Sequence, residues 1–309
     1  MRAVLLAFVL STFAVGAVAD EAWYPSKYGK DDTLGAVNNL SPAIVVEAAK
    51  LVKTGKTYSL GVTTGPDTPA YGTRNYQIFT EASIIGEPLG SNKASGTDDF
   101  LATWMGIGSQ LDGLGHLGID FVYYNGNKEA DILRPHGLLK LSTDKIPPIV
   151  TRGVLLDIVA LKGKPLAPGY AISKADIEAA AAKQGTPIRK GDVVLLHTGW
   201  LAQLEKSKDK KAFLDKEPGL GKEGATYLAS LGVVAVGADQ WGVEVLPFEV
   251  ESEAFPVHQI LIAKNGVHLL ENMNVGPLAA DKGYEFLFVL GQPKFAGAVQ
   301  AVINPVAIR

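Results

Sequence analysis

Three polar residues in a glycine-rich stretch have the side-chain types that bind a divalent metal. The stretch Gly106–His116 reads Gly-Ile-Gly-Ser-Gln-Leu-Asp-Gly-Leu-Gly-His and contains Gln110, Asp112 and His116. Gln110 and Asp112 are two residues apart, so their side chains project from the same side of an extended segment. An aspartate oxygen, a histidine nitrogen and a glutamine carbonyl together suit zinc or manganese. The alternative interpretation is a glycine-rich turn in which the aspartate is a cap.

A second pair of candidate ligands lies in the C-terminal part of the chain. His258 precedes the apolar triplet Ile260-Leu261-Ile262, and Glu271 ends the mostly apolar run from Val267 to Leu270. A buried carboxylate is costly unless it is paired or bound to a metal, which favours a ligand role for Glu271. The alternative is a glutamate at a strand end that faces water.

Three further residues are assigned to the substrate pocket. His197 stands at the end of an apolar strand-like run, and Trp241 follows Asp239-Gln240 after another such run. Trp241 and Trp104 are the tryptophans that we expect to contact a flat substrate, although filling of the core explains a tryptophan equally well. The alternative for His197 is a hydrogen-bonded structural histidine.

Helix signals occur at three places. Ser41-Pro42 supplies a cap and a first-turn proline for a helix that reaches Val52, and Glu223–Leu231 has helical spacing. Ser173 with Asp176 three residues later opens a third helix through Gln184, which Gly185 ends.

Strand-like apolar runs outnumber these helices and do not alternate with them one for one. This order predicts a mixed α/β or α+β fold rather than a doubly wound sheet or a barrel. Without repeats or linker-like segments, residues 20–309 are expected to form one domain. The expected strands are residues 57–62, 76–85, 154–161, 192–197, 233–237, 260–262, 284–290 and 300–308.

The composition excludes several classes of protein. The 309 residues contain no cysteine, which rules out disulfides, thiolate metal sites and a cysteine nucleophile. There are 29 basic and 32 acidic residues, so no basic surface for nucleic acid is expected. Phosphate-binding loop motifs such as G-x-G-x-x-G after a strand are missing, so nothing supports a nucleotide cofactor. The expected partner is a small-molecule substrate.

The first 19 residues have the pattern of a secretory signal peptide. Arg2 precedes an apolar stretch from Val4 to Val18, which closes on Ala17-Val18-Ala19 before Asp20. A membrane span would need roughly 20 apolar residues, and no later stretch has that length. We therefore expect cleavage after Ala19 and a secreted or periplasmic mature protein outside the membrane. A buried N-terminal helix is the alternative.

Taken in order, these segments resemble the cyclase superfamily that includes bacterial kynurenine formamidase, isatin hydrolase and a metal-dependent dienelactone hydrolase. The resemblance implies a swivelling β/β/α fold, commonly assembled as homodimers or homotetramers. The matching segments are Tyr28–Asn38, Gln110–His116, Gly153–Asp157, Gly191–Trp200, Gly237-x-Asp239, His258 and Glu271-Asn272.

The family pattern H-x-G-T-H-x-D-x-P-x-H is kept only in part. Asp112 and His116 match its ligand aspartate and its last histidine, which moves the proton. Gly106 and Gln110 stand where the pattern has its two ligand histidines. Gln110 is thereby left as either a ligand or a substrate-binding group, as in a longer, glutamine-bearing branch of the superfamily.

The later ligands of the family, a histidine and a glutamate, match His258 and Glu271. The resemblance therefore implies one divalent ion, manganese or zinc, rather than a bridged pair. Such an ion lowers the pKa of a bound water to about 7 and polarises a carbonyl, while His116 transfers the proton. The expected activity is hydrolysis of a small amide, lactam or lactone.

Two other functions fit the same residues. One is a metal-dependent lyase or cyclase, in which the metal would stabilise an enolate. The other is an exported binding protein that has lost catalysis together with the two ligand histidines. Retention of His116 with Asp112, His258 and Glu271 favours an enzyme.

Overall fold

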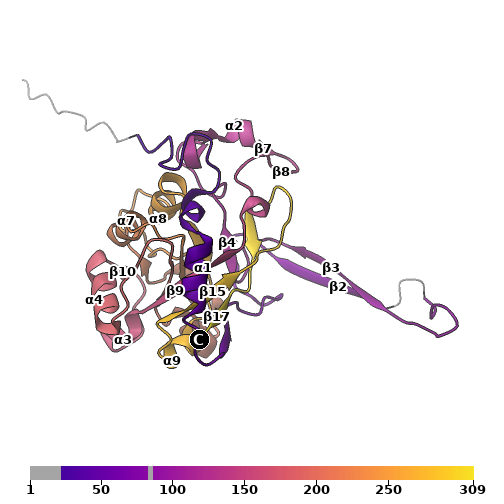
Figure 1. Ribbon diagram of the computed structural model, residues 1–309. Helices are drawn as coiled ribbons and strands as arrows, with labels where there is room; N and C mark the ends of the chain where they lie inside the picture. The colour runs from indigo at the N-terminus through magenta and orange to yellow at the C-terminus, as the bar shows by residue number, and fades with distance from the viewer. Residues whose placement is uncertain (1–21, 83–85) are drawn as a thin grey trace, which may run out of the picture.

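A curled, mixed sheet of nine strands lies at the centre of the described part of the molecule (Figure 1). The computed structural model describes residues 22–82 and 86–309. The fold is mixed α+β, as the sequence predicts. The strands of the central sheet are β1 (Thr57–Ser59), β4 (Gln110–Asp112), β9 (Ile149–Asp157), β11 (Val193–His197), β13 (Ala235–Ala238), β14 (His268–Glu271), β15 (Glu285–Leu290), β16 (Gln300–Val302) and β17 (Val306–Ile308).

The order across the sheet is β1-β17-β15-β9-β11-β13-β14-β4-β16. The four middle strands β9, β11, β13 and β14 run parallel, and antiparallel strands extend the sheet on both sides. The carboxyl ends of the parallel strands therefore meet at one edge, and β4 runs antiparallel to β14 beside them. Chemistry-bearing residues from distant parts of the chain are brought together there.

Helices and shorter ribbons surround the sheet. The ribbons pair β2 (Tyr76–Ala82) with β3 (Thr97–Thr103), β5 (Val122–Tyr123) with β6 (Asn127–Lys128), β7 (Leu133–Arg134) with β8 (Gly137–Leu138), and β10 (Ala171–Ile172) with β12 (Gly219–Leu220). The helices are η1 (Gly35–Asn39), α1 (Pro42–Ala49), η2 (Tyr124–Gly126), α2 (Glu129–Ile132), η3 (Thr143–Lys145), α3 (Ile158–Lys162), α4 (Lys174–Gln184), α5 (Trp200–Ser207), α6 (Lys210–Asp215), α7 (Lys222–Ser230), α8 (Pro256–His258), η4 (Gln259–Lys264) and α9 (Gly276–Ala280).

The central strands are buried on both faces. In β9, Val154 and Leu156 belong to a core that also contains apolar side chains of α4, α7 and η4. Leu155, between them, points to the other face and joins a second core with side chains of α9 and β15. This period-two alternation with apolar residues on both faces is what a sheet covered by other elements on each side requires.

The three predicted helices are confirmed, with small differences at their ends. Ser41 caps α1 by accepting from the N–H of Ile44, but α1 ends at Ala49 rather than at Val52. Residues 222–230 form α7. The α4 helix has the predicted capping box and ends at Gly185, whose φ of 68° is left-handed.

Several strand predictions are wrong in part or in full; β1, for example, ends at Ser59 rather than at residue 62. Residues 260–262 lie in η4, a π-helix whose Leu261 and Ile262 are buried in the core; a short apolar run does not distinguish a strand from a buried helix. Residues 158–161 belong to α3, because Asp157 accepts a hydrogen bond from the N–H of Ala160 and starts a helix there. The run 300–308 forms two strands, β16 and β17, at opposite ends of the sheet.

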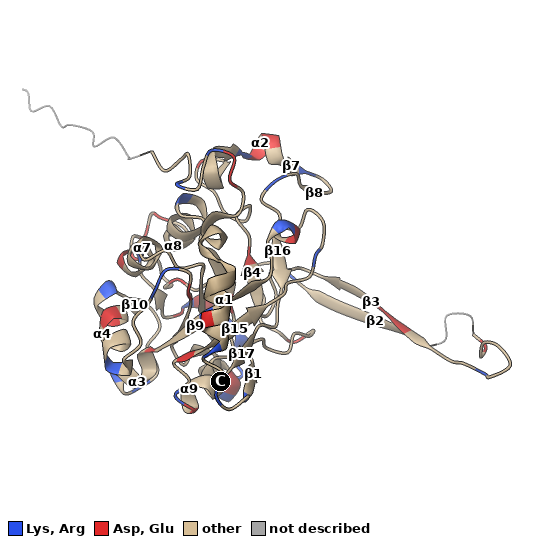
Figure 2. Ribbon diagram, in the orientation of Figure 1, with Lys and Arg blue, Asp and Glu red and all other residues tan. Residues whose placement is uncertain are grey.

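A long hairpin of β2 and β3 projects from the body of the molecule (Figure 1). Phe79 and Phe100 lie opposite each other on it and are both exposed. Acidic residues of the hairpin include Asp98 and Asp99 in β3 (Figure 2). Residue 85, the predicted end of the first of these strands, lies outside the described residues.

The proposed signal peptide, residues 1–19, also lies outside the described residues. Within the part of the chain that the structure describes, no helix has the length and apolar character needed to cross a membrane.

Candidate metal centre

Strand β4 brings the first group of predicted ligands to the second. In the antiparallel pairing of β4 with β14, Gln110 lies opposite Glu271, and on the other side of β4 Asp112 lies opposite Gln300. Gln110 and Asp112 point the same way, as predicted from their spacing, and Gln110 Nε2 donates to Asp112 Oδ1 at 3.3 Å. Gln110 Nε2 also donates to Glu271 at 2.6 Å. This amide therefore holds both carboxylates in place.

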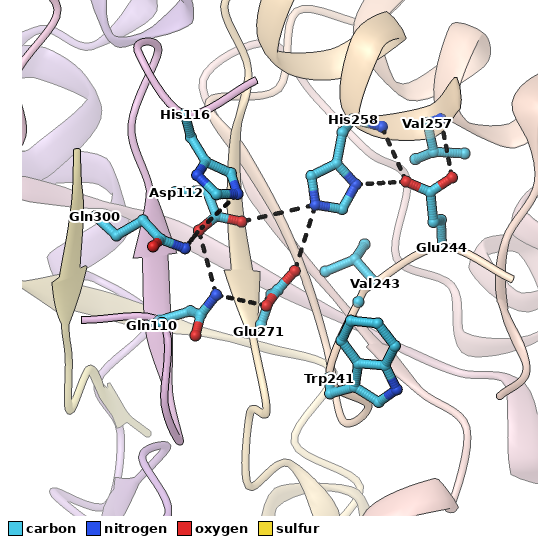
Figure 3. Close-up of polar contacts among 12 residues, drawn as sticks. Gln110, Asp112, His116, Trp241, Val243, Glu244, Val257, His258, Glu271 and Gln300 are labelled. Atoms are coloured by element: carbon cyan, nitrogen blue, oxygen red, sulfur yellow. Dashed lines mark hydrogen bonds and ion pairs between the residues drawn. The ribbon is translucent and has the colours of Figure 1, made fainter. Parts of the chain in front are cut away.

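His258 completes the cluster from a different element (Figure 3). It ends α8, and its Nε2 lies 3.8 Å from Asp112 Oδ2 and 3.4 Å from Glu271 Oε1. On the other side of the ring, Nδ1 bonds the carboxylate of Glu244. The backbone N–H groups of Val257 and His258 donate to the same carboxylate. Glu244 thus fixes the ring with Nε2 directed at the two carboxylates.

His116 lies at the open side of this cluster. Its Nε2 is 4.0 Å from Asp112 Oδ1, and one fifth of its side chain is exposed, whereas the side chain of Asp112 is fully buried. Packing requires a glycine before it, because a Cβ at Gly113 would lie 2.7 Å from the backbone oxygen of Val299. The turn therefore presents His116 to solvent beside the buried carboxylates.

Burial and neighbouring charge shift the pKa values in this cluster. Burial, with the negative charge of Asp112, raises the pKa of Glu271 to about 8. Burial alone would lower the pKa of His258, but hydrogen bonds to Glu244 and Glu271 outweigh it and raise the value to about 10. The pKa of His116 is lowered by burial, which keeps its imidazole neutral at neutral pH.

The donor set fits one divalent ion. Ligand atoms about 2.0–2.2 Å from a metal lie roughly 3–4 Å from one another, which is the spacing found here. One ligand atom each from Asp112, His116 and His258 lie within 4.8 Å of one another. Asp112 Oδ2 is buried and has no hydrogen-bond partner, although such an atom is costly to leave unsatisfied. An ion at this place would satisfy it.

Gly106 stands in a space that is already filled. A Cβ at this position would lie 2.5 Å from Nη1 of Arg74 and 3.0 Å from Nε2 of Gln300. Arg74 Nη1 donates to the carbonyl of Gly106 itself at 2.8 Å. A histidine at position 106 would have to displace the end of the Arg74 side chain, which occupies that space in this protein.

An aromatic group lies on the far side of His258. The ring of Phe255 meets the ring of His258 edge to face at 5.3 Å. Tyr71 contacts Phe255 and stacks on Trp241 with 5.1 Å between ring centroids. Trp241 is 8% exposed and packs with Trp200, so most of its ring is held by the protein.

The other two predicted substrate residues lie in different surroundings. His197 Nδ1 bonds Asp157 at 2.9 Å across the ends of β11 and β9, and among the described residues no hydrogen bond or ion pair joins it to Asp112 or His258. Trp104 is 53% exposed and lines a hollow of about 560 Å³ that also contains Gln300. A role in substrate binding stays a prediction for both.

Sequence comparison assigns the chain to a family. The family model described as "Putative cyclase" matches residues 58–245. The chain belongs to the cyclase family. The match contains Asp112, His116 and Glu244, and the remaining ligand candidates His258 and Glu271 follow it. No curated protein sequence matches the chain significantly.

Solved structures agree with this assignment. A structure described as a novel cyclase is 29% identical, with a TM-score of 0.83 over 92% of this chain and 98% of the other. Isatin hydrolase A from Ralstonia solanacearum is 18% identical, with a TM-score of 0.63 over 87% of this chain and 97% of its own. A predicted metal-dependent hydrolase from Bacillus stearothermophilus, also 18% identical, has a TM-score of 0.54 over 82% and 98%. The last two share the fold.

Three site residues were not predicted from the sequence. Glu244 interrupts the apolar run Val243–Leu246, which is the same signal that singled out Glu271. Gln300 likewise interrupts an apolar run, and its Nε2 donates to Asp112 at 2.7 Å. Arg74 precedes β2 and has no comparable signal.

Proposed function

We propose that the protein is a metal-dependent hydrolase that opens a small amide, lactam or lactone. The observation that carries this proposal is that His258 Nε2 lies 3.8 Å from Asp112 and 3.4 Å from Glu271, beside a neutral, partly exposed His116. Family membership and the hydrolases among the structures that share the fold support it.

Asp112, His258 and Glu271 would hold the ion, which we propose to be manganese or zinc. When bound, such an ion lowers the pKa of a water to about 7 and polarises a carbonyl oxygen. Gln110 and Gln300 donate to the carboxylates and fix their orientation. Glu244 keeps the His258 proton on Nδ1, so Nε2 has a free lone pair for the ion.

His116 is the proposed general base and general acid. Its lowered pKa leaves Nε2 able to accept a proton at neutral pH. Its partial exposure lets it contact both the attacking water and the leaving nitrogen or oxygen of a substrate. It would take the proton from the water and return it to the leaving group, a transfer that usually contributes about 10² to 10⁴ in rate.

The proposal is tested by activity with one substrate of each class. Formanilide, isatin and a simple γ-lactone would be offered to the metal-loaded protein and to a His116→Ala variant. Hydrolysis of at least one substrate, lost in the variant, supports the proposal. Proton exchange at the α-carbon of an enolisable substrate without hydrolysis would favour the lyase alternative. Tight binding with no turnover of any compound would favour a binding protein.

A further inference from the structure

Arg74 stands beside the candidate metal centre without a carboxylate partner. Its Nη1 donates to the carbonyl of Gly106 at 2.8 Å, and its guanidinium lies 5.8 Å from the centre of the Tyr71 ring. Within residues 22–82 and 86–309 it forms no ion pair, whereas Arg152 pairs with both Asp192 and Glu285. A guanidinium has five N–H donors, so most of those of Arg74 have no acceptor among the described residues.

Gln300 lies next to Arg74. The position of a Cβ built on Gly106 is 2.5 Å from Arg74 Nη1 and 3.0 Å from Gln300 Nε2, so both groups flank one point. Gln300 Nε2 uses one N–H on Asp112 and has a second. Gln300 also borders the hollow of about 560 Å³ that Trp104 lines. A ligand in that hollow can therefore reach the amide of Gln300, which donates to Asp112.

Among the described residues, no ion pair balances the positive charge of Arg74. With a divalent ion bound, Asp112 and Glu271 are balanced by the ion. The negative charge of Glu244 is held behind His258 by three N–H donors. The guanidinium, which lies beside Gly106 and Gln300, then keeps an unbalanced positive charge, and its planar fork matches a carboxylate.

We propose that Arg74 and Gln300 form a carboxylate-binding subsite beside the metal centre. This inference rests on the proposed hydrolase function. The bound carboxylate is either a group that the substrate carries next to the cleaved bond, or the carboxylate that hydrolysis creates. The ring of Tyr71 lies 5.8 Å from the Arg74 guanidinium and Trp104 lines the hollow with Gln300, and both rings favour a ligand with a flat ring.

The binding test does not depend on turnover. Benzoate and benzamide, which have the same ring and differ in charge, would be titrated calorimetrically into manganese-loaded protein. We expect Arg74→Gln to weaken benzoate about 10- to 100-fold and to change benzamide less than threefold. Arg74→Lys keeps the charge but loses the fork and should fall between the two. Arg309→Gln, at the opposite end of the sheet, removes the same charge as a control.

A kinetic test separates the two sources of the carboxylate. Formanilide and 2-formamidobenzoate differ only by one carboxylate on the ring. If the substrate carries the carboxylate, Arg74→Gln lowers kcat/KM for 2-formamidobenzoate at least tenfold more than for formanilide. If the product carboxylate is the ligand, the variant weakens benzoate but lowers both kcat/KM values equally.

The subsite is contradicted if Arg74→Gln binds benzoate as tightly as the wild type does, or loses benzoate and benzamide equally. Loss of bound manganese in Arg74→Gln, measured by plasma mass spectrometry, would also overturn it, because Arg74 would then serve only to balance the ligand carboxylates. A wild type that hydrolyses neither formamide, nor isatin, nor the γ-lactone, but shows the predicted benzoate effect, would refute the proposed function and leave the subsite standing.

Discussion

The carboxylate of Glu244 and the imidazole of His258 form a buried pair in which Nδ1 faces the carboxylate and Nε2 faces Asp112 and Glu271. The two residues are 14 apart in sequence, and the backbone of α8 closes the contact from behind by donating two N–H groups. The direction of His258 Nε2 is therefore fixed before any ion binds and displaces its proton. Outer partners of this kind commonly contribute 10- to 100-fold to metal affinity.

This relationship predicts the effect of Glu244→Gln. The amide keeps the size of the side chain but removes the charge that favours the proton on Nδ1. We expect manganese and zinc affinity to fall about 10- to 100-fold while the fold is kept. Affinity would be measured by competition with a fluorescent chelator, with Glu251→Gln, an exposed acid in the same loop region, as the matched control. Equal affinities for the two variants would contradict the role of Glu244.

The metal affinity should rise with pH. Without metal, burial and Asp112 raise the pKa of Glu271 to about 8, and the pKa of His258 is raised to about 10. Both groups are therefore protonated at pH 7, and the ion competes with these protons. We expect affinity to increase between pH 6 and 8 and close to two protons to be released per ion at pH 7. Calorimetry in buffers of different ionisation enthalpy counts the protons; no release would show that both groups are already deprotonated at pH 7.

His116→Ala separates proton transfer from metal binding. If His116 moves the proton, the variant keeps its metal and loses about 10² to 10⁴ in kcat. Because its Nε2 lies near the ligand atoms of Asp112 and His258, the other possibility is a fourth ligand. A variant that is purified without metal would show that His116 binds the ion. Full turnover in the variant would remove it from the mechanism.

Gly106→His tests whether the Arg74 side chain prevents a histidine from occupying position 106, where the family pattern has a ligand histidine. The new side chain would collide with the guanidinium, and overpacking of this kind costs about 1–3 kcal/mol. We expect a Tm lower by a few degrees, which Arg74→Ala in the same chain partly restores. Gly291→His, at a position with open space around it, is the control. A stable single variant would mean that Arg74 moves aside freely.

Local signals predicted the parts of the fold that local contacts determine. The α4 helix was correctly bounded because its cap, Ser173 with Asp176, and its end at Gly185 are all within the segment. The spacing of Gln110 and Asp112 likewise gave their common direction. The segment 260–262 was missed because its conformation is set by packing against distant elements, not by its own pattern.

Site residues could be predicted from the sequence only where a polar residue type stood in an apolar segment. Asp112, His258 and Glu271 stood out as polar groups in apolar surroundings, and the structure brings them together. Arg74 could not be found in this way, since it lies in a polar segment and reaches Gly106 from 32 residues away. Arg74 lies in the site because Gly106 has no side chain and leaves space for the guanidinium. A single sequence gives no sign that this glycine and this arginine are in contact.

The metal content of the purified protein tests the central claim most directly. Protein prepared without chelator or histidine tag would be analysed by plasma mass spectrometry beside Asp112→Ala and His258→Ala variants, with circular dichroism to confirm that each is folded. The account predicts about one manganese or zinc ion per chain in the wild type and loss of it in both folded variants. A wild type that stays free of metal after dialysis against manganese and zinc would contradict it.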